Sequence, residues 1–154
     1  MDIYTKLNTL GITIPPPITR PKEWKLEPYV IHKNFLFLAG HGPRRDDKVI
    51  YTGRLGENLD IDVGKKAAKL CVLNLLSSAQ LALKDLNRVN KIIKLFGMVR
   101  CVQDFHYQPE VIDGASELLI EIFGDRGKHA RTAVGMYDLP RGIAVEIEMI
   151  LAFD

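Results

Sequence analysis

The sequence predicts an α+β fold in which one β-sheet carries two helices on a single face. Segments of β type flank two helical segments, in the order strand, strand, helix, strand, helix, strand, strand. The 154 residues suit one domain, spanning 1–154, with a sizeable core. The composition, 47% hydrophobic and 26% charged, is that of a globular protein. Because both helices pack on the same face, the other face needs a cover, and we expect a partner subunit to supply it.

The N-terminal segment, residues 1–24, is expected to form a short helix and an extended arm. Residues 3–10 have a helical pattern that ends at Gly11. The prolines Pro15-Pro16-Pro17 and Pro21 favour a polyproline-like conformation. Such an arm is expected to lie on the surface and to pack through Ile14, Ile18 or Trp24.

Residues 29–40 are predicted to form two strands joined by a turn at His32-Lys33-Asn34, because β-branched and aromatic residues dominate this stretch. Residues 35–38 are apolar on both faces, which predicts that the second strand is covered on both sides. A further short strand is expected at residues 49–52, closed by Gly53.

The two predicted helices have clear boundaries. Residues 62–88 are helical, with Asp60 or Asp62 as the N-cap, and little polar surface in the middle. This helix should therefore be buried on more than one side. Residues 109–123 form the second helix, with Pro109 in its first turn and Gly124 at its end. Gly114 inside it indicates either a close approach by another segment or an imperfect helix.

The remaining strands are expected at residues 92–103, 131–137 and 143–153, with a bulge at Gly97 as one option. In the last strand, alternation places Glu146 and Glu148 on one face, about 7 Å apart. Carboxylates on a partly apolar strand face require partners or a function.

Charge and composition exclude several classes of protein. The net charge is only +2, and the basic pairs Arg44-Arg45 and Lys65-Lys66 have acidic neighbours, which argues against nucleic-acid binding. The chain lacks the run of about 18 apolar residues of a membrane span and lacks a signal peptide. Cys71 and Cys101 are expected to be buried thiols. We therefore expect a cytoplasmic protein without contact to a membrane.

Metal and cofactor motifs are also missing from the sequence. The four histidines show no ligand spacing and are interpreted as surface or hydrogen-bonded residues. No phosphate-binding glycine loop and no Ser/His/Asp arrangement can be identified. We accordingly expect no metal and no cofactor.

Arg131 is the candidate anion-binding residue. It opens a predicted strand, and its guanidinium has the geometry for bidentate binding of a carboxylate. Space around it is provided by three small neighbours, Ala130, Ala133 and Gly135. The alternative is a structural salt bridge from Arg131 to Glu146 or Glu148.

The run Ala130-Arg131, Leu139-Pro140 and Val145-Glu146-Ile147-Glu148 resembles the C-terminal signature of the RidA/YjgF (L-PSP) family. Residues 34–40 are similar to the family's Gly-Asn-hydrophobic-Ser-Gly segment. The resemblance covers residues 29–152 and points to a longer-chain branch. It implies a chorismate-mutase-like fold with a mixed sheet, a homotrimer, and three clefts between subunits that bind small carboxylate-bearing molecules.

The resemblance also implies residue roles. Arg131 would hold the substrate carboxylate, Glu146 would position or activate water, and the backbone of Ala133 would line the site. We predict that the charged ends of Arg131 and Glu146 lie within about 10 Å, the Debye length at ordinary salt, in one chain or between subunits.

Two family site positions differ in this sequence. An ungapped match places Leu26 where active deaminases have a tyrosine, and Tyr29 takes that place if the alignment shifts. The family's site asparagine falls at Asp113 or Gly114. We retain Tyr29, Asp113 and Gly114 as ligand-binding candidates.

Three functions follow from these residues. The first is hydrolysis of reactive enamines and imines, such as 2-iminopropionate, to keto acids and ammonia, with Arg131 and Glu146 as the catalytic pair. The second is a catalytically silent trimer that binds small carboxylates or has a regulatory role. The third is an endoribonuclease, which the neutralised basic patches and the lack of exposed aromatic pairs disfavour. Leu26 and Asp113 favour the second function over the first.

Overall fold

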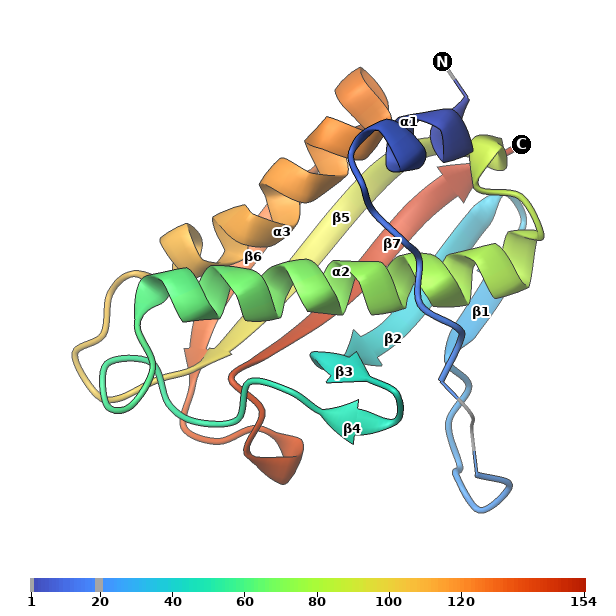
Figure 1. The fold of residues 1–154 in the computed structure, drawn as a ribbon. Coiled ribbons are helices and arrows are strands. Elements are labelled where there is room, and N and C mark those ends of the chain that lie inside the picture. The colour runs from blue at the N-terminus through green and yellow to red at the C-terminus, as the bar shows by residue number, and fades with distance from the viewer. Residues whose placement is uncertain (1, 19–20) are drawn as a thin grey trace.

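The computed structural model describes residues 2–18 and 21–154 (Figure 1). Its helices are α1 (Ile3–Thr9), α2 (Ile61–Leu83) and α3 (Gln108–Phe123). Its strands are β1 (Tyr29–His32), β2 (Phe35–His41), β3 (Arg44–Arg45), β4 (Lys48–Val49), β5 (Val89–Arg100), β6 (Ala130–Met136) and β7 (Val145–Phe153). Short 3₁₀ turns occupy Leu86–Arg88, Gly124–Gly127 and Pro140–Gly142.

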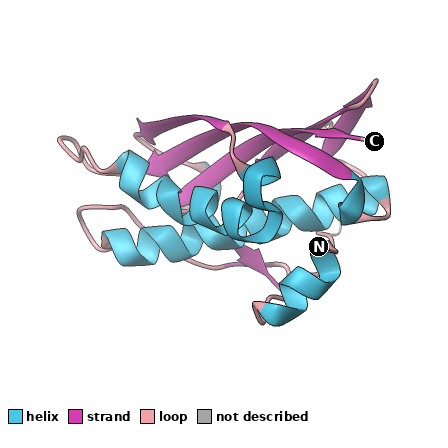
Figure 2. Cartoon of the chain, turned by 90° about the horizontal axis from the view of Figure 1, so that it is seen from above, coloured by secondary structure: helices cyan, strands magenta, loops and turns pink. Residues whose placement is uncertain are grey.

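Five of the strands form one mixed sheet in the order β1-β2-β7-β5-β6. The β5–β6 pair is parallel and the other neighbouring pairs are antiparallel. Figure 2 shows the helices together on one side of this sheet. The predicted α+β architecture, with both long helices on one face, is therefore confirmed.

Helix α2 lies between the sheet and the N-terminal arm. It begins where the Asp60 side chain accepts a hydrogen bond from Val63 N, at 2.8 Å, and ends where Lys84 adopts a left-handed conformation. On its outer side Ser77 Oγ donates to the Pro15 carbonyl at 2.6 Å, where the arm crosses the helix (Figure 1). The prediction that this helix is buried on more than one side is confirmed. Its predicted end at residue 88 is wrong, because the chain turns at Lys84.

Helix α3 packs closely against α2. Its Pro109 start and Gly124 end are as predicted. A Cβ atom on Gly114 would lie 2.5 Å from the Lys65 carbonyl oxygen of α2, so Gly114 marks a close approach of the two helix backbones. Gly97 of β5 has a similar role, because a Cβ there would lie 2.6 Å from the Ile112 side chain. The bulge expected at Gly97 is wrong, since the register shifts of β5 lie near its start.

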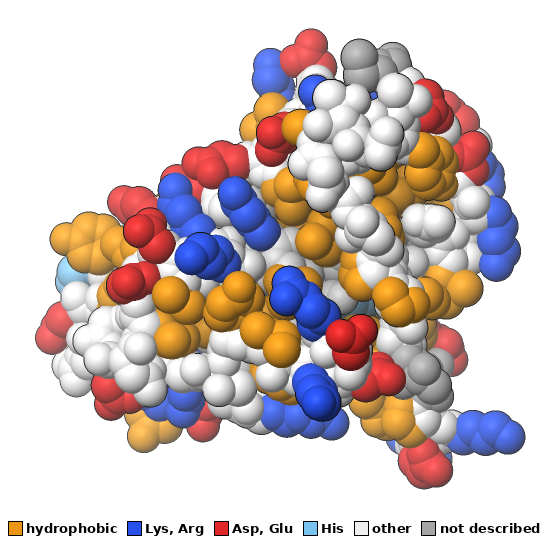
Figure 3. All heavy atoms as spheres, in the orientation of Figure 1, with side chains coloured by type: hydrophobic (Ala, Val, Ile, Leu, Met, Phe, Trp, Pro, Cys, Tyr) orange, Lys and Arg blue, Asp and Glu red, His pale blue; other side chains and the backbone are white. Residues whose placement is uncertain are grey.

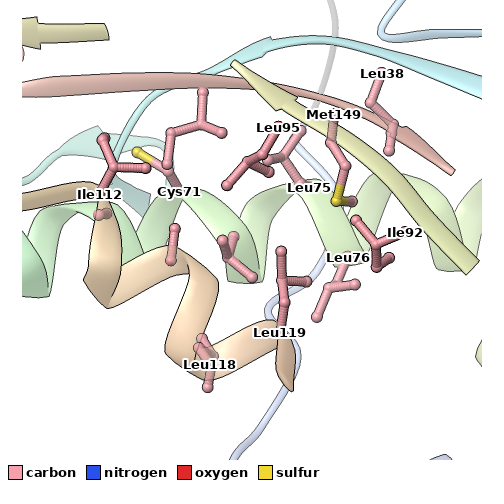
Figure 4. Packing of buried hydrophobic residues seen from close by; sticks show 14 of the residues in the cluster. Leu38, Cys71, Leu75, Leu76, Ile92, Leu95, Ile112, Leu118, Leu119 and Met149 are labelled. Atoms are coloured by element: carbon pink, nitrogen blue, oxygen red, sulfur yellow. The ribbon is translucent and has the colours of Figure 1, made fainter. Parts of the chain in front are cut away.

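The core lies between the helices and the sheet. Along β7, alternate residues from Val145 to Leu151 are buried toward the helices, whereas Glu146 and Glu148 lie on the opposite, open face. Figure 4 shows Leu75 of α2 beside Leu95 of β5 and Met149 of β7. Burial of each such side chain contributes about 1.5–3 kcal/mol.

The open face of the sheet carries exposed apolar side chains. Phe37 of β2 is 42% exposed and its pairing partner Val30 of β1 is 54% exposed. By contrast, Leu36 and Leu38 of β2 are buried beneath the helices. Within one chain β2 is thus covered on one side only, and the prediction of a cover on the second side depends on a partner.

The N-terminal segment follows the expected helix and extended arm. Asp2 caps α1 by accepting a hydrogen bond from Thr5 N at 2.7 Å, and residues 12–18 have no regular secondary structure. Met1, Thr19 and Arg20, which belong to the predicted arm, lie outside the described residues.

A hairpin of β3 and β4 replaces the strand predicted at residues 49–52. Asp46 and Asp47 form its turn with φ values of 50° and 58°, as a tight hairpin turn requires. Tyr51 has a φ of 57°, so the strand cannot continue through it. The sequence prediction was wrong here because β3 is too short and polar to show alternation.

Cys71 and Cys101 are free, buried thiols, as predicted. Among the described helices none is long and apolar enough to cross a membrane.

Candidate functional site

A pocket of about 130 Å³ lies between the N-terminal arm, the end of β2, the β3–β4 hairpin and the start of β7. It is comparable to a cavity of roughly 150 Å³ that holds benzene. Its apolar wall comes from Ile18, Trp24, Leu26, Val49, Leu81 and Ile143, and its polar side chains are those of His41, Arg44, Ser78, Arg141 and Glu146.

Glu146 places its carboxylate in this pocket, on the open side of β7. A Cβ atom on Gly40 would lie 2.6 Å from Glu146 Oε1, so the missing side chain at Gly40 makes room for the carboxylate. Burial, and secondarily the charge of Glu148, raises the pKa of Glu146. A raised pKa makes a half-buried carboxylate a stronger proton acceptor than an exposed one.

A histidine–serine pair, His41 and Ser78, also lines the pocket. His41 Nδ1 is 2.7 Å from the Ala39 carbonyl, and His41 Nε2 is 2.7 Å from Ser78 Oγ. Because a carbonyl only accepts, Nδ1 carries the proton and Ser78 donates to Nε2. Burial lowers the pKa of His41, which favours the neutral ring. This hydrogen bond connects β2 to α2. The sequence could not predict it, because the two residues are 37 positions apart.

Arg44 and Arg141 also line the pocket, although the sequence analysis did not select them as site residues. Arg44 starts the hairpin, and Asn74 Nδ2 donates to the carbonyls of Gly42 and Arg44, each at 3.0 Å. Arg141 follows the predicted Leu-Pro turn and has a left-handed φ of 58°. In the sequence, Arg44 belongs to a basic pair with acidic neighbours, so it gave no signal for a site.

Arg131 lies on the other side of the sheet. Its Nη1 atom is 2.7 Å from Asp113 Oδ1 and donates to Ser116 Oγ at 3.1 Å, both on α3. The structural salt bridge anticipated for Arg131 therefore exists, but its partner is Asp113 and not Glu146 or Glu148.

A polar chain extends from Arg131 to His129. Ser116 Oγ is 3.1 Å from His129 Nε2, and His129 Nδ1 is bonded to the Gly127 carbonyl at 2.6 Å. Burial lowers the pKa of His129, and the positive charge of Arg131 acts in the same direction. The spacing of three residues between Asp113 and Ser116 was the available sequence signal for this cluster.

Within one chain Arg131 and Glu146 do not meet. Arg131 pairs with Leu95, which faces the helices, whereas Glu146 pairs with Met98 on the open face. The predicted cleft shared by the two residues thus requires a second copy of the chain, and it stays a prediction.

The other candidates lie on the helix side. Ala133 and the half-buried Tyr29 pack against the core, and Gly114 faces Lys65. Leu26, which an ungapped match to the family places at the tyrosine position, lines the pocket.

The family model "YjgF/chorismate_mutase-like, putative endoribonuclease" matches residues 6–142. The chain belongs to this family. The match confirms the resemblance to RidA/YjgF proteins inferred from the C-terminal motif.

Three relatives are similar to this chain over nearly their whole length. Protein TCP17 of Trypanosoma cruzi is 36% identical over 97% of this chain and 92% of its own. Atu1372 of Agrobacterium tumefaciens, of unknown function, is 37% identical, with a TM-score of 0.91 over 99% of this chain and 92% of its own. A "putative endoribonuclease" of Shewanella oneidensis is 27% identical, with a TM-score of 0.94 over 99% and 100%.

A more distant structure of the same fold is Escherichia coli TdcF with bound serine. It is 17% identical, with a TM-score of 0.63 over 92% of this chain and 94% of its own. At that identity the likeness concerns the fold alone.

Proposed function

We propose that this protein is a cytoplasmic homotrimer that hydrolyses reactive 2-imino carboxylates to keto acids and ammonia. The observation that carries the proposal is the carboxylate of Glu146, half-buried in a small, largely apolar pocket, where burial raises its pKa. Such a group can take a proton from water and return it within one reaction.

The trimer is supported by the uncovered side of the sheet. Phe37, Val30 and the half-buried Ile150 form an apolar strip on the face that no helix covers. The strand β6, which carries Arg131, is at the edge of the sheet. A second copy on the open face would cover the strip and could bring its β6 edge toward Glu146 of the first.

In the proposed reaction Glu146 accepts a proton from water as the oxygen attacks the imine carbon. Glu146 then returns this proton to the nitrogen of the aminol, ammonia leaves as the carbonyl forms, and the hydroxyl proton passes to the ammonia to give ammonium. Water and the iminium acid give a keto acid and ammonium, with no other reactant. A cationic group must hold the substrate carboxylate in position, and the family resemblance assigns this role to Arg131 of a neighbouring copy.

A silent carboxylate-binding trimer is the second candidate. Asp113 already binds Arg131, and a leucine replaces the tyrosine of active deaminases in the pocket wall. The serine bound to TdcF is itself a small carboxylate, which agrees with either function.

Ribonuclease activity has less support. On the face shown in Figure 3, basic and acidic side chains are interspersed, so the phosphate backbone would not meet a one-sign field there.

The test is ammonia release from freshly generated 2-iminopropionate. We expect acceleration by the wild type, a large loss in Glu146→Gln, and wild-type rates in Glu121→Gln, whose carboxylate is exposed on α3. If trimeric wild type gives no acceleration, the silent binder replaces this proposal. Sedimentation equilibrium would test the trimer separately, since it has three times the mass of the chain.

A further inference from the structure

Two arginines that line the pocket have no carboxylate or hydrogen-bond partner for their guanidinium groups among the described residues. Across residues 2–18 and 21–154, neither Arg44 nor Arg141 has a carboxylate within 4 Å, and neither guanidinium donates a hydrogen bond. Several other arginines have partners, as in the pairs Arg131–Asp113 at 2.7 Å and Arg100–Asp138 at 2.6 Å. The pocket therefore offers positive charge that the fold does not use.

The backbone conformation is fixed at each of these two arginines. Asn74, a buried side chain of α2, fixes the carbonyls of Gly42 and Arg44. Arg141 is held in a left-handed conformation, which costs a non-glycine residue about 1 kcal/mol or more. The fold thus fixes the backbone at both arginines, and at Arg141 it does so at a conformational cost.

The two positive charges act on one another. Burial, followed by the charge of Arg141, lowers the pKa of Arg44, and the nearby charge of Asp47 only partly opposes this. An anion between the two guanidinium groups would remove their repulsion and could accept hydrogen bonds from both.

The wall beside the arginines is apolar. Leu26 from the arm is 52% exposed and Leu81 from α2 is 41% exposed, although both line the pocket with Ile143. A ligand with an apolar chain would cover these side chains and gain about 25 cal/mol for each Å² of apolar surface removed from water. The volume of about 130 Å³ suits a compact ligand with a short, branched chain.

We infer that Arg44 and Arg141 hold the carboxylate of a small ligand whose branched aliphatic chain lies against Leu26 and Leu81. The inference uses the pocket of the proposed function and deepens it. The substrate class is then branched-chain 2-imino acids. Their carboxylate binds to Arg44 and Arg141 of one chain and not to Arg131, which is already paired with Asp113.

Calorimetric titration of the full chain with 4-methylpentanoate tests this carboxylate site directly. Neutral 4-methylpentanamide lacks the charge and acetate lacks the branched chain. We expect both to bind at least about tenfold more weakly than 4-methylpentanoate, because each loses one of the two recognised features. Arg44→Gln and Arg141→Gln should each weaken 4-methylpentanoate at least about tenfold. Arg45→Gln is the matched control, since Arg45 is exposed on the same hairpin outside this pocket, and it should leave the Kd within twofold.

Three results would overturn the inference: no saturable binding of 4-methylpentanoate to the wild type, equal binding of the amide, or loss of binding in Arg131→Ala with wild-type affinity in both arginine variants. Melting curves of the variants identify any that fail to fold, and Arg44→Lys and Arg141→Lys then serve as milder replacements. Binding that depends on Arg44 and Arg141, without imine hydrolysis by the wild type, would support the carboxylate site and reject the deaminase. Carboxylate binding by Arg44 and Arg141 and imine hydrolysis can therefore each be rejected without rejecting the other.

Discussion

The carboxylate of Asp113 lies 2.7 Å from the guanidinium of Arg131, at the position where the family resemblance places a substrate-binding arginine. The Arg131 side chain is 23% exposed and that of Asp113 is 42% exposed, so the pair is accessible to water and to a competing anion. An external carboxylate at Arg131 would have to displace an internal one. Arg131 is therefore less available to an external carboxylate than an arginine without an internal partner would be.

Replacement of Asp113 by asparagine should release Arg131. We expect anion binding at Arg131, measured by titration with a small carboxylate such as pyruvate, to improve on the order of tenfold, since about 1.4 kcal/mol of competition is removed. Stability should change by less than about 1 kcal/mol, as for other exposed ion pairs. Glu117→Gln, on the same helix, is the control; an unchanged pyruvate affinity in Asp113→Asn would mean that Arg131 is not an anion site.

The raised pKa of Glu146 predicts a pH dependence of stability. Because the folded-state pKa lies above the ordinary value of 4.5, the folded protein binds this proton more tightly than the unfolded chain. The resulting stabilisation is complete below about pH 4.5 and is lost as the pH rises through the folded pKa.

Glu146→Gln should therefore melt at a higher temperature than wild type at pH 8, with the difference disappearing toward pH 4. Glu121→Gln provides the comparison for loss of one exposed carboxylate. A Glu146→Gln melting difference that does not vary with pH would contradict the assigned cause.

Loss of the Ser78 hydroxyl should leave His41 Nε2 buried without a partner. We expect Ser78→Ala to lower the free energy of unfolding by about 1–3 kcal/mol, measured by urea denaturation. A double-mutant cycle with His41→Gln should show a coupling energy of at least about 0.5 kcal/mol. Additive effects of the two substitutions would mean that the hydrogen bond contributes little.

Gly114→Ala should destabilise the protein although alanine favours a helix. The new methyl group would lie 2.5 Å from the Lys65 carbonyl oxygen, so α2 and α3 must separate. We expect a net loss of about 1–3 kcal/mol, as for overpacked cores. The exposed Glu117→Ala in the same helix should stay within about 0.5 kcal/mol of wild type; a stabilised Gly114→Ala would show that the helices can move apart freely.

Local signals in the sequence predicted most of the fold. Asp60, Pro109 and Gly124 mark helix ends because capping and backbone geometry depend on neighbouring residues only. The turn at Lys33, with a φ of 53°, was recognisable for the same reason. The β3–β4 hairpin was missed because the chain from Arg44 to Val49 offers no alternation of apolar and polar residues.

The candidate site was harder to predict because it depends on contacts between distant segments. Arg131 and Asp113 meet only because α3 packs beside β6, and alternation in β7 gave no information on that packing. Arg44 and Arg141 are 97 positions apart in the chain, and each looked like ordinary surface charge on its own.

The path of the N-terminal arm has a consequence for how this protein can change. The arm supplies Ile18, Trp24 and Leu26 to the pocket wall, yet no described residue between 17 and 28 is fully buried in the core. Part of the pocket wall therefore comes from a stretch of the chain that contributes little to the core. Substitutions in the arm can retune the pocket with little effect on stability, so related chains can diverge in their ligands while keeping the same sheet and helices.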